Sequence, residues 1–96
     1  LLRSTSSRRY KSDIRELTLD SALLYNFEPK TFTFDPTGET KSGFIAEELA
    51  EILPDVVLLN KEGAADGIDW NVVTTLMISE IKKLRTELDE VKVLIA

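Results

Sequence analysis

Hydrophobic and polar positions divide the chain into a polar start, a mixed middle and a strongly periodic end. Residues 1–13 are rich in serine and basic side chains and have no apolar period, which predicts an extended arm. Residues 14–68 hold short apolar runs broken by proline and glycine, which predicts a compact part of short helices and strands. Residues 69–96 repeat apolar side chains at helical spacing. We therefore expect one small α+β domain with a long C-terminal helix.

The first half of the compact part predicts a helix and a strand pair. Thr18 or Asp20 can cap a short helix that runs through residues 22–24 and ends before Pro29, since their side-chain oxygens accept free backbone N–H groups. Residues 31–34 alternate threonine and phenylalanine, the period of a half-buried strand. Residues 35–38 have turn composition, and residues 44–45 are expected to pair back as the second strand.

The second half of the compact part predicts a further helix and strand. Apolar side chains recur at helical spacing over residues 45–53, with Glu47 and Glu48 in the first turn, where the helix dipole favours negative charge. Pro54 stops this helix. Residues 56–59 are continuously apolar and predict a buried strand, and residues 60–68 predict a hairpin-like connection with glycine at two points.

The long helix, which Asp69 can cap, carries a heptad seam. Its a and d side chains are Thr74, Met77, Ile81, Leu84, Leu88, Val91 and Ile95. Glu80 with Arg85, and Glu87 with Lys92, occupy g and the following e positions, which favours a parallel coiled coil. The chain has no other segment of similar length to cover this stripe, so the pattern favours self-association over packing within the chain. The side chains at a and d leave two and three strands open.

Composition narrows the chemistry. The chain has neither cysteine nor histidine, which excludes disulfides, Ser-His-Asp and Cys-His catalysis and most transition-metal sites. The familiar nucleophile–base pair that remains is serine or threonine with lysine. With 12 basic and 17 acidic side chains the chain is a poor general nucleic-acid binder, although Arg3, Arg8, Arg9, Lys11 and Arg15 crowd its start. No apolar run approaches the roughly 20 residues that span a bilayer. The first residues suggest the continuation of an upstream segment.

Three ordered motifs carry a family resemblance. The first is Ser6-Ser7-x-Arg9-x-Lys11 followed by residues 12–14, Ser-Asp-Ile. The second is Gly-Phe-Ile-Ala-Glu-Glu at residues 43–48, with Leu-Pro-Asp-Val-Val at 53–57. The third is Ile-Asp-Trp at 68–70, at the entry to the final helix. In this order they resemble the C-terminal intramolecular chaperone domain of phage endosialidases, tail spikes, tail fibres and neck appendages, over residues 6 to about 90.

This resemblance implies a parallel homotrimer that clamps the ends of its parent chain and then cuts itself off. Ser6 would be the nucleophile and Lys11 the general base, with Arg9 and Asp13 as possible support. The cut would fall at Thr5–Ser6, which we favour, or at Ser6–Ser7. The seam side chains Met77, Ile81, Leu84, Leu88, Val91 and Ile95 would hold the trimer. Two positions depart from the family pattern, since Ser7 replaces a frequent aspartate and Glu47 a frequent glutamine.

The same resemblance implies the surroundings in which the domain works. Its partners would be two further copies and the β-rich stalk of its own parent chain, without nucleic acid, membrane, small-molecule ligand, metal or cofactor. It would act in the host cytoplasm during virion assembly, with the parent protein ending in the virion tail. The three segments 1–13, 14–68 and 69–96 would form one chaperone domain.

Protonation links the expected chemistry to assembly. A lysine amine accepts a proton only when it is neutral, whereas an exposed lysine is charged at neutral pH. Burial and neighbouring positive charges disfavour the ammonium form. We therefore expect the arm to be exposed in a monomer and covered by a neighbouring subunit in the oligomer, so that cleavage depends on assembly.

Two other functions fit parts of the pattern. A similar domain lies within membrane-anchored transcription factors that resemble myelin regulatory factor, where cleavage frees a DNA-binding trimer. An upstream DNA-binding region and a following transmembrane helix would mark that context. The seam alone also fits a coiled-coil adaptor without catalysis.

Overall fold

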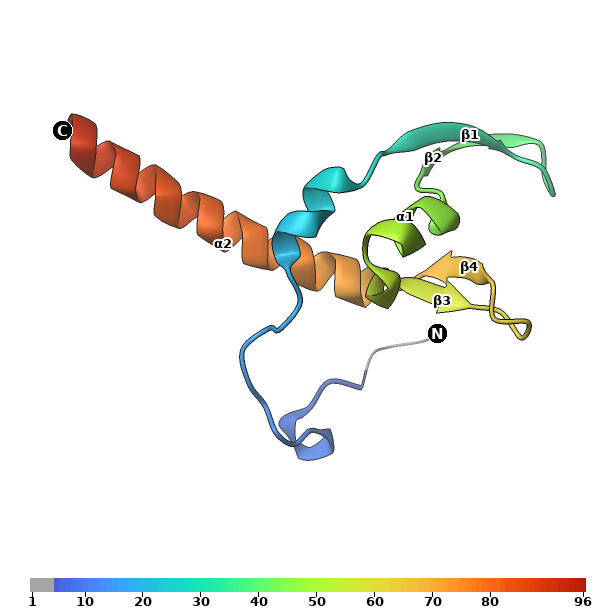
Figure 1. Cartoon of the computed structure of the whole chain (residues 1–96), viewed down its shortest axis with the longest axis horizontal. Helices are drawn as coiled ribbons and strands as arrows, with labels where there is room; N and C mark the ends of the chain where they lie inside the picture. Colours follow the sequence, from blue (N-terminus) through green and yellow to red (C-terminus); the bar gives the residue numbers. More distant parts are fainter. Residues whose placement is uncertain (1–4) are drawn as a thin grey trace.

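The computed structural model describes residues 5–96 and shows a small mixed body from which one helix and one arm extend (Figure 1). The Cα radius of gyration is 17.3 Å, whereas a compact domain of this length has about 12.5 Å. The elements in chain order are η1 (Arg8–Tyr10), η2 (Ser21–Asn26), β1 (Lys30–Phe34), β2 (Glu39–Gly43), α1 (Ala46–Ile52), η3 (Pro54–Val56), β3 (Val57–Leu59), β4 (Ala65–Ile68) and α2 (Trp70–Ile95), where η denotes a 3₁₀ helix. The expected upstream continuation and Arg3 fall within residues 1–4, outside the described residues.

The first helix of the body is capped as expected but is a 3₁₀ helix. The Asp20 carboxylate accepts the backbone N–H of Ala22 at 3.1 Å, so Asp20, rather than Thr18, is the cap. The helix ends at Asn26, and Phe27, which follows it, is buried in the core. Leu23 and Leu24 pack against the same core. η2 therefore anchors to the body the segment that follows the arm.

The strand pair has its first strand where the alternating pattern predicts it. β1 pairs antiparallel with β2 from Lys30↔Gly43 to Phe34↔Glu39, and Gly38 in the turn adopts φ +75°. The prediction of Phe44 and Ile45 as the second strand is wrong. The four-residue turn brings Glu39 opposite Phe34, so pairing is complete at Gly43, and Phe44 follows the strand and packs against the core.

A second hairpin follows α1. Glu47 and Glu48 lie in the first turn of α1, and the helix ends before Pro54, as predicted. β3 pairs antiparallel with β4, a strand that the sequence pattern did not resolve within the expected connection. Leu58 and Leu59 of β3 were expected to be buried and are 52% and 64% exposed, because this two-stranded sheet has no layer over them in the single chain.

The core is small and lies where α1, η3 and the start of α2 meet. Its buried side chains are Phe27, Leu49, Leu53, Val56, Val73 and Leu76. Asp69 caps α2 as predicted, since its carboxylate accepts the backbone N–H groups of Asn71 at 3.1 Å and Val72 at 3.4 Å. The cap fixes where the long helix begins, directly after β4.

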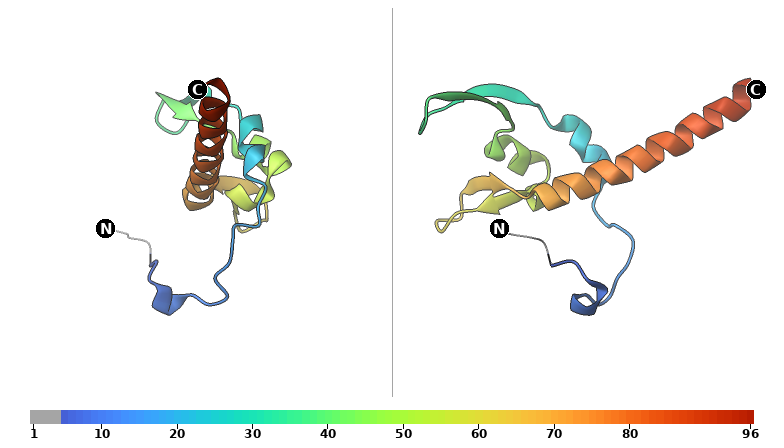
Figure 2. Two further views of the ribbon diagram at one scale, coloured as in Figure 1. Left: turned by 90° about the vertical axis from the view of Figure 1, so that its left-hand side faces the viewer. Right: turned by 180° about the vertical axis from the view of Figure 1, so that it is seen from behind.

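α2 uses two adjacent faces differently. Val73, Leu76 and Glu80 face the body and are buried. From Ile81 onward every residue of the helix is exposed, and Figures 1 and 2 show this half projecting beyond the other elements. The long C-terminal helix is thus confirmed, and the body packs on a face offset by one residue from the heptad seam.

Candidate functional site

Ser6 and Lys11 are in direct contact at the start of the arm. The Lys11 Nζ donates a hydrogen bond to the Ser6 Oγ at 2.9 Å. The η1 turn between them bends the chain back, with the N–H of Tyr10 bonded to the carbonyl of Ser7 and that of Lys11 to the carbonyl of Arg8, each at 3.0 Å. One chain alone therefore brings a hydroxyl and an amine together at the distance that proton transfer requires.

Ser7 and Arg9 support this turn. The Ser7 Oγ caps η1 by accepting the backbone N–H of Arg9 at 3.4 Å, and the Arg9 Nη1 lies 3.2 Å from the same oxygen. The Arg9 guanidinium also lies 4.7 Å from the centre of the Tyr10 ring. A serine and an aspartate can make the same cap. Ser7 thus fills the structural role open to the aspartate that it replaces, and Arg9 acts on the turn rather than on Ser6.

The other predicted arm residues lie apart from the pair. Asp13 adopts a positive φ of 52°, and its carboxylate lies 3.5 Å from the Arg15 guanidinium. It makes no described hydrogen bond or ion pair with Ser6 or Lys11. Thr5, on the other side of the expected cut, is exposed. Asp13 can therefore shape the arm, whereas no described contact gives it a direct role in the pair.

The described part of the arm is open to solvent in the single chain. Every residue from Thr5 to Thr18 is exposed, including Ser6 and Lys11. Both views in Figure 2 show the η1 turn standing away from the strands and from α2. The contact between the two side chains is formed, but water surrounds it.

The predicted seam is an uncovered apolar stripe on α2. Met77, Ile81, Leu84, Leu88 and Val91 are 49–56% exposed, and Ile95 is 79% exposed. Leu24 and Tyr25 of η2 flank its beginning, where they line a shallow groove of about 170 Å³ together with Met77, Glu80, Ile81 and Leu84. The apolar surface thus continues from the helix onto the body.

A buried polar cluster beside the seam was not found from the sequence. The Ser21 Oγ, only 1% exposed, donates to the Glu80 carboxylate at 2.6 Å and accepts from the Lys83 Nζ at 2.8 Å. The Ser79 hydroxyl lies 3.1 Å from the same oxygen. The hydrogen bond from Ser21 lowers the pKa of Glu80 from its ordinary value, Lys83 lowers it further, and burial opposes both.

This cluster corrects the expected pairing of Glu80 with Arg85 between helices. Glu80 is 7% exposed and bonded within its own chain, while Arg85 lies 3.3 Å from Asp89 on the same helix. A glutamate at a g position resembles a coiled-coil flank, and no local pattern showed that Ser21 would cover it. Glu87 and Lys92 remain the g and e charges available to a parallel neighbour.

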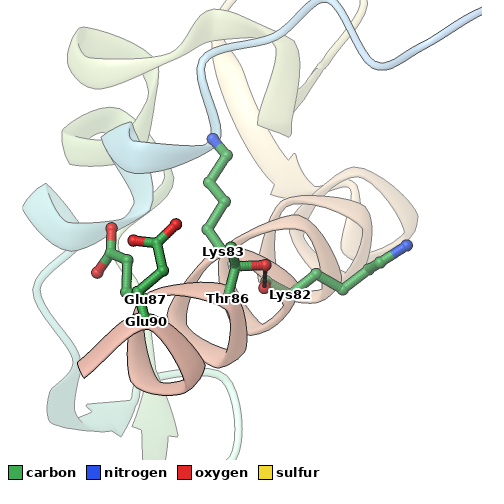
Figure 3. A pocket seen from close by; sticks show the side chains of 5 residues that line it. All are labelled: Lys82, Lys83, Thr86, Glu87 and Glu90. Carbon is green, nitrogen blue, oxygen red and sulfur yellow. Dashed lines mark hydrogen bonds between the residues drawn. The ribbon is translucent and has the colours of Figure 1, made fainter. Parts of the chain in front are cut away.

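The surface next to the cluster is polar and of both signs. A depression of about 430 Å³ is lined by Lys82, Lys83, Thr86, Glu87 and Glu90. In Figure 3 the Lys83 side chain reaches towards η2, where it bonds Ser21. Lys82 points away from η2, and Glu87 and Glu90 lie side by side. The Thr86 hydroxyl here donates to the Lys82 carbonyl at 3.1 Å, and Lys83 is held by the cluster.

Two further site types were sought in residues 5–96. No group of acidic side chains there is placed to hold a metal ion. No helix in this part of the chain is both long and apolar enough to cross a membrane.

Comparison with known proteins bears on the whole arrangement. A family model described as "Chaperone of endosialidase", classed as a peptidase family, matches residues 6–58, more than half of the chain. The match begins at Ser6 and includes Lys11, η2, both strands of the first hairpin, α1 and β3 up to Leu58. No curated protein matches the chain.

Proposed function

The chain belongs to the endosialidase chaperone family, and from this premise we propose that it trimerises through α2, assists the folding of its parent chain and then cuts itself off at Thr5–Ser6. The observation that carries the catalytic part is the 2.9 Å hydrogen bond between the Lys11 Nζ and the Ser6 Oγ. The observation that carries the assembly part is the uncovered seam.

The seam supports a parallel trimer because no described residue of the single chain covers it beyond the body, whereas the neighbouring face of α2 packs on the body. Val73 and Leu76 already bury α2 against its own body, so the body does not need the seam. Exposed apolar surface of this extent on a helix marks an interaction site. Three copies side by side would cover the seam from Met77 to Ile95 and set Glu87 against Lys92 of a neighbour.

The cut would proceed by acyl transfer. Neutral Lys11 takes the proton of the Ser6 hydroxyl, and the Ser6 Oγ attacks the carbonyl carbon of Thr5. The bond from that carbon to the Ser6 nitrogen breaks, and the nitrogen receives the proton, which leaves an ester between Thr5 and the Ser6 Oγ. Water then hydrolyses the ester, giving a Thr5 carboxylate and a chain that begins with the free amine of Ser6.

Assembly would control the cleavage step by removing water from the Ser6–Lys11 pair. The Ser6–Lys11 pair is exposed in the single chain, and an exposed lysine carries a proton at neutral pH and cannot act as a base. Covering the arm in the trimer removes water from the amine, and loss of water disfavours a charged form. Cleavage would thus follow assembly rather than precede it.

The chaperone role follows from the same trimer. We place the domain behind a β-rich phage spike or fibre segment, whose non-local pairing folds slowly because loop closure precedes contact. Holding three ends together raises their effective concentration. After the cut, the clamp is no longer joined to the assembled parent, so the assembly is hard to reverse. The site of action would be the host cytoplasm during virion assembly, with the parent in the virion tail.

Intact-mass spectrometry of the chain with an upstream tag tests the chemistry. Wild type should lose everything before Ser6, whereas Ser6→Ala and Lys11→Ala should keep full length. Lys11→Arg should also stay whole, because a guanidinium does not give up its proton in proteins. Ser12→Ala is the matched control, since the hydroxyl of this exposed arm serine makes no described hydrogen bond to Lys11 or Ser6, and it should cut normally. Efficient cutting of Lys11→Arg would exclude Lys11 as the base.

A further inference from the structure

We propose, on the basis of the proposed trimer, that the Arg8–Tyr10 turn of one copy docks into a groove between the two hairpins of a neighbouring copy. The groove has a volume of about 370 Å³ and lies between the first hairpin, α1, β4 and the start of α2. This is at the lower end of the range for ligand pockets, which suits one or two large side chains. It is a surface distinct from the heptad seam.

The groove offers aromatic walls and two free carboxylates. Phe34 is 40% and Trp70 54% exposed, and Phe44 lines the same groove with its ring centre 6.0 Å from that of Trp70. Glu47 and Asp66 are exposed on the α1 and β4 side, and neither has an ion pair among the described residues. Lys41 lies over the Phe34 ring at the hairpin side, so the negative part of the groove is the side formed by α1 and β4.

The η1 turn has the complementary chemistry. Tyr10 is 61% exposed, and the Arg9 guanidinium stacks on its ring at 4.7 Å. Arg8 is exposed beside them and has no described ion pair. Tyrosine and arginine are, with tryptophan, the side chains enriched at the energetic centres of interfaces.

Charge along the chain points the same way. The arm, residues 1–13, holds four basic side chains and one acidic side chain, whereas residues 14–96 hold eight basic and sixteen acidic. Opposite potentials on two surfaces steer their encounter and fix their register. The arm is therefore attracted to the body of this protein, although in the single chain its η1 turn stands apart from the strands that form the groove (Figures 1 and 2).

The arm that fills each groove comes from a neighbouring copy, because in a threefold ring every groove then receives one arm. In such a ring each copy gives one arm and receives one, and the contact closes on itself. Docking covers the turn that carries Ser6 and Lys11 and removes water from their contact. Arg8 and Arg9 would take the Glu47 and Asp66 carboxylates, which leaves Lys11 without a partner of opposite charge.

Cross-linking tests the docking directly, because the natural chain has no cysteine. Ser12→Cys, next to the η1 turn, and Ala65→Cys, which lines the groove, are combined with Ser6→Ala, which cannot cut, and treated with a short bismaleimide. We expect covalent dimers and trimers on a denaturing gel. A control that pairs Ser12→Cys with Glu51→Cys, on α1 but outside the groove, should stay monomeric on the gel. Docking between copies would be overturned if cross-links formed only within one chain, or if the control gave the same covalent dimers and trimers. If the sample sediments as a trimer but gives no covalent dimers or trimers on the gel, docking between copies is also overturned.

A second measurement tests the consequence for the cut. Glu47→Lys with Asp66→Lys should slow cleavage at least about tenfold in a chain that still forms trimers, whereas Glu51→Lys with Glu62→Lys, the same charge change outside the groove, should not. Adding Arg8→Glu and Arg9→Glu to the groove variant should restore part of the rate. If wild type cuts and the groove variant cuts at the same rate, the docking is refuted while the proposed self-cleavage stands. A wild-type chain that never cuts would refute the proposed self-cleavage, while the cross-linking result would still decide the docking.

Discussion

Leu84→Ala should weaken the trimer while leaving the single-chain fold intact. Leu84 is 52% exposed in the chain, so about half of its side chain remains to be buried by neighbouring copies. Full burial of a leucine is worth roughly 1.5–3 kcal/mol. Burying the remaining half therefore contributes about 1 kcal/mol per copy, or about 3 kcal/mol for three. Since 1.4 kcal/mol is a factor of ten, the trimer dissociation constant should rise about a hundredfold.

Sedimentation equilibrium over a range of concentrations measures this change. Wild type should give about three times the 10.8 kDa chain mass, and Leu84→Ala should dissociate at higher concentration. Leu76→Ala is the contrasting variant: Leu76 is fully buried in the body, so it should cost about 2–5 kcal/mol of folding stability at any concentration. Val93→Ala, 77% exposed and outside the seam, is the neutral control. Equal weakening by Val93→Ala and Leu84→Ala would refute the assignment of the seam.

Three further predictions follow from single contacts. Ser7→Ala should slow cleavage by loosening the η1 cap, whereas Ser7→Asp, which can make the same cap, should keep the rate, as a time course of intact mass would show. Because the folded-state pKa of Glu80 is lowered, its contribution to stability is present above its ordinary value of 4.5 and is lost as the pH falls through the folded pKa. Between neutral pH and about pH 3, wild type should therefore lose more stability in urea unfolding than Glu80→Gln, and equal losses would contradict the role of the cluster. Asp69→Ala should cost about 0.5–2 kcal/mol in the same assay by removing the cap of α2, and Asp69→Asn should recover most of it.

Sequence reasoning succeeded where a pattern is local and periodic. The long helix and its Asp69 cap follow from heptad spacing and from capping chemistry that acts over three residues. β1 follows from alternation. The second strand was misplaced because residues 39–42 are polar on both faces, and an exposed hairpin strand of that kind has no hydrophobic signal. The buried prediction for Leu58 and Leu59 failed because a short apolar run does not reveal whether another layer covers it.

The candidate site shows the same division. Ser6 and Lys11 came from a motif, and the structure adds the η1 turn that brings them into contact. Their catalytic role stays a prediction. Ser21 and Glu80 are 59 residues apart in the chain, and no local pattern links positions that meet only after folding. The face of α2 that holds Glu80 was therefore assigned to a neighbouring chain and belongs to the body.

The central claim is that assembly switches on the cut, and a seam variant far from the arm tests it most directly. Leu84→Asp places a charge in the seam and touches neither Ser6 nor Lys11, and burying an unpaired charge costs several kcal/mol. Intact-mass spectrometry is run on tagged wild type and tagged Leu84→Asp, with circular dichroism to show that the variant is folded and sedimentation to show that it is monomeric. The account predicts complete cutting of wild type and an uncut variant. Cutting at the wild-type rate in a folded Leu84→Asp monomer would contradict it.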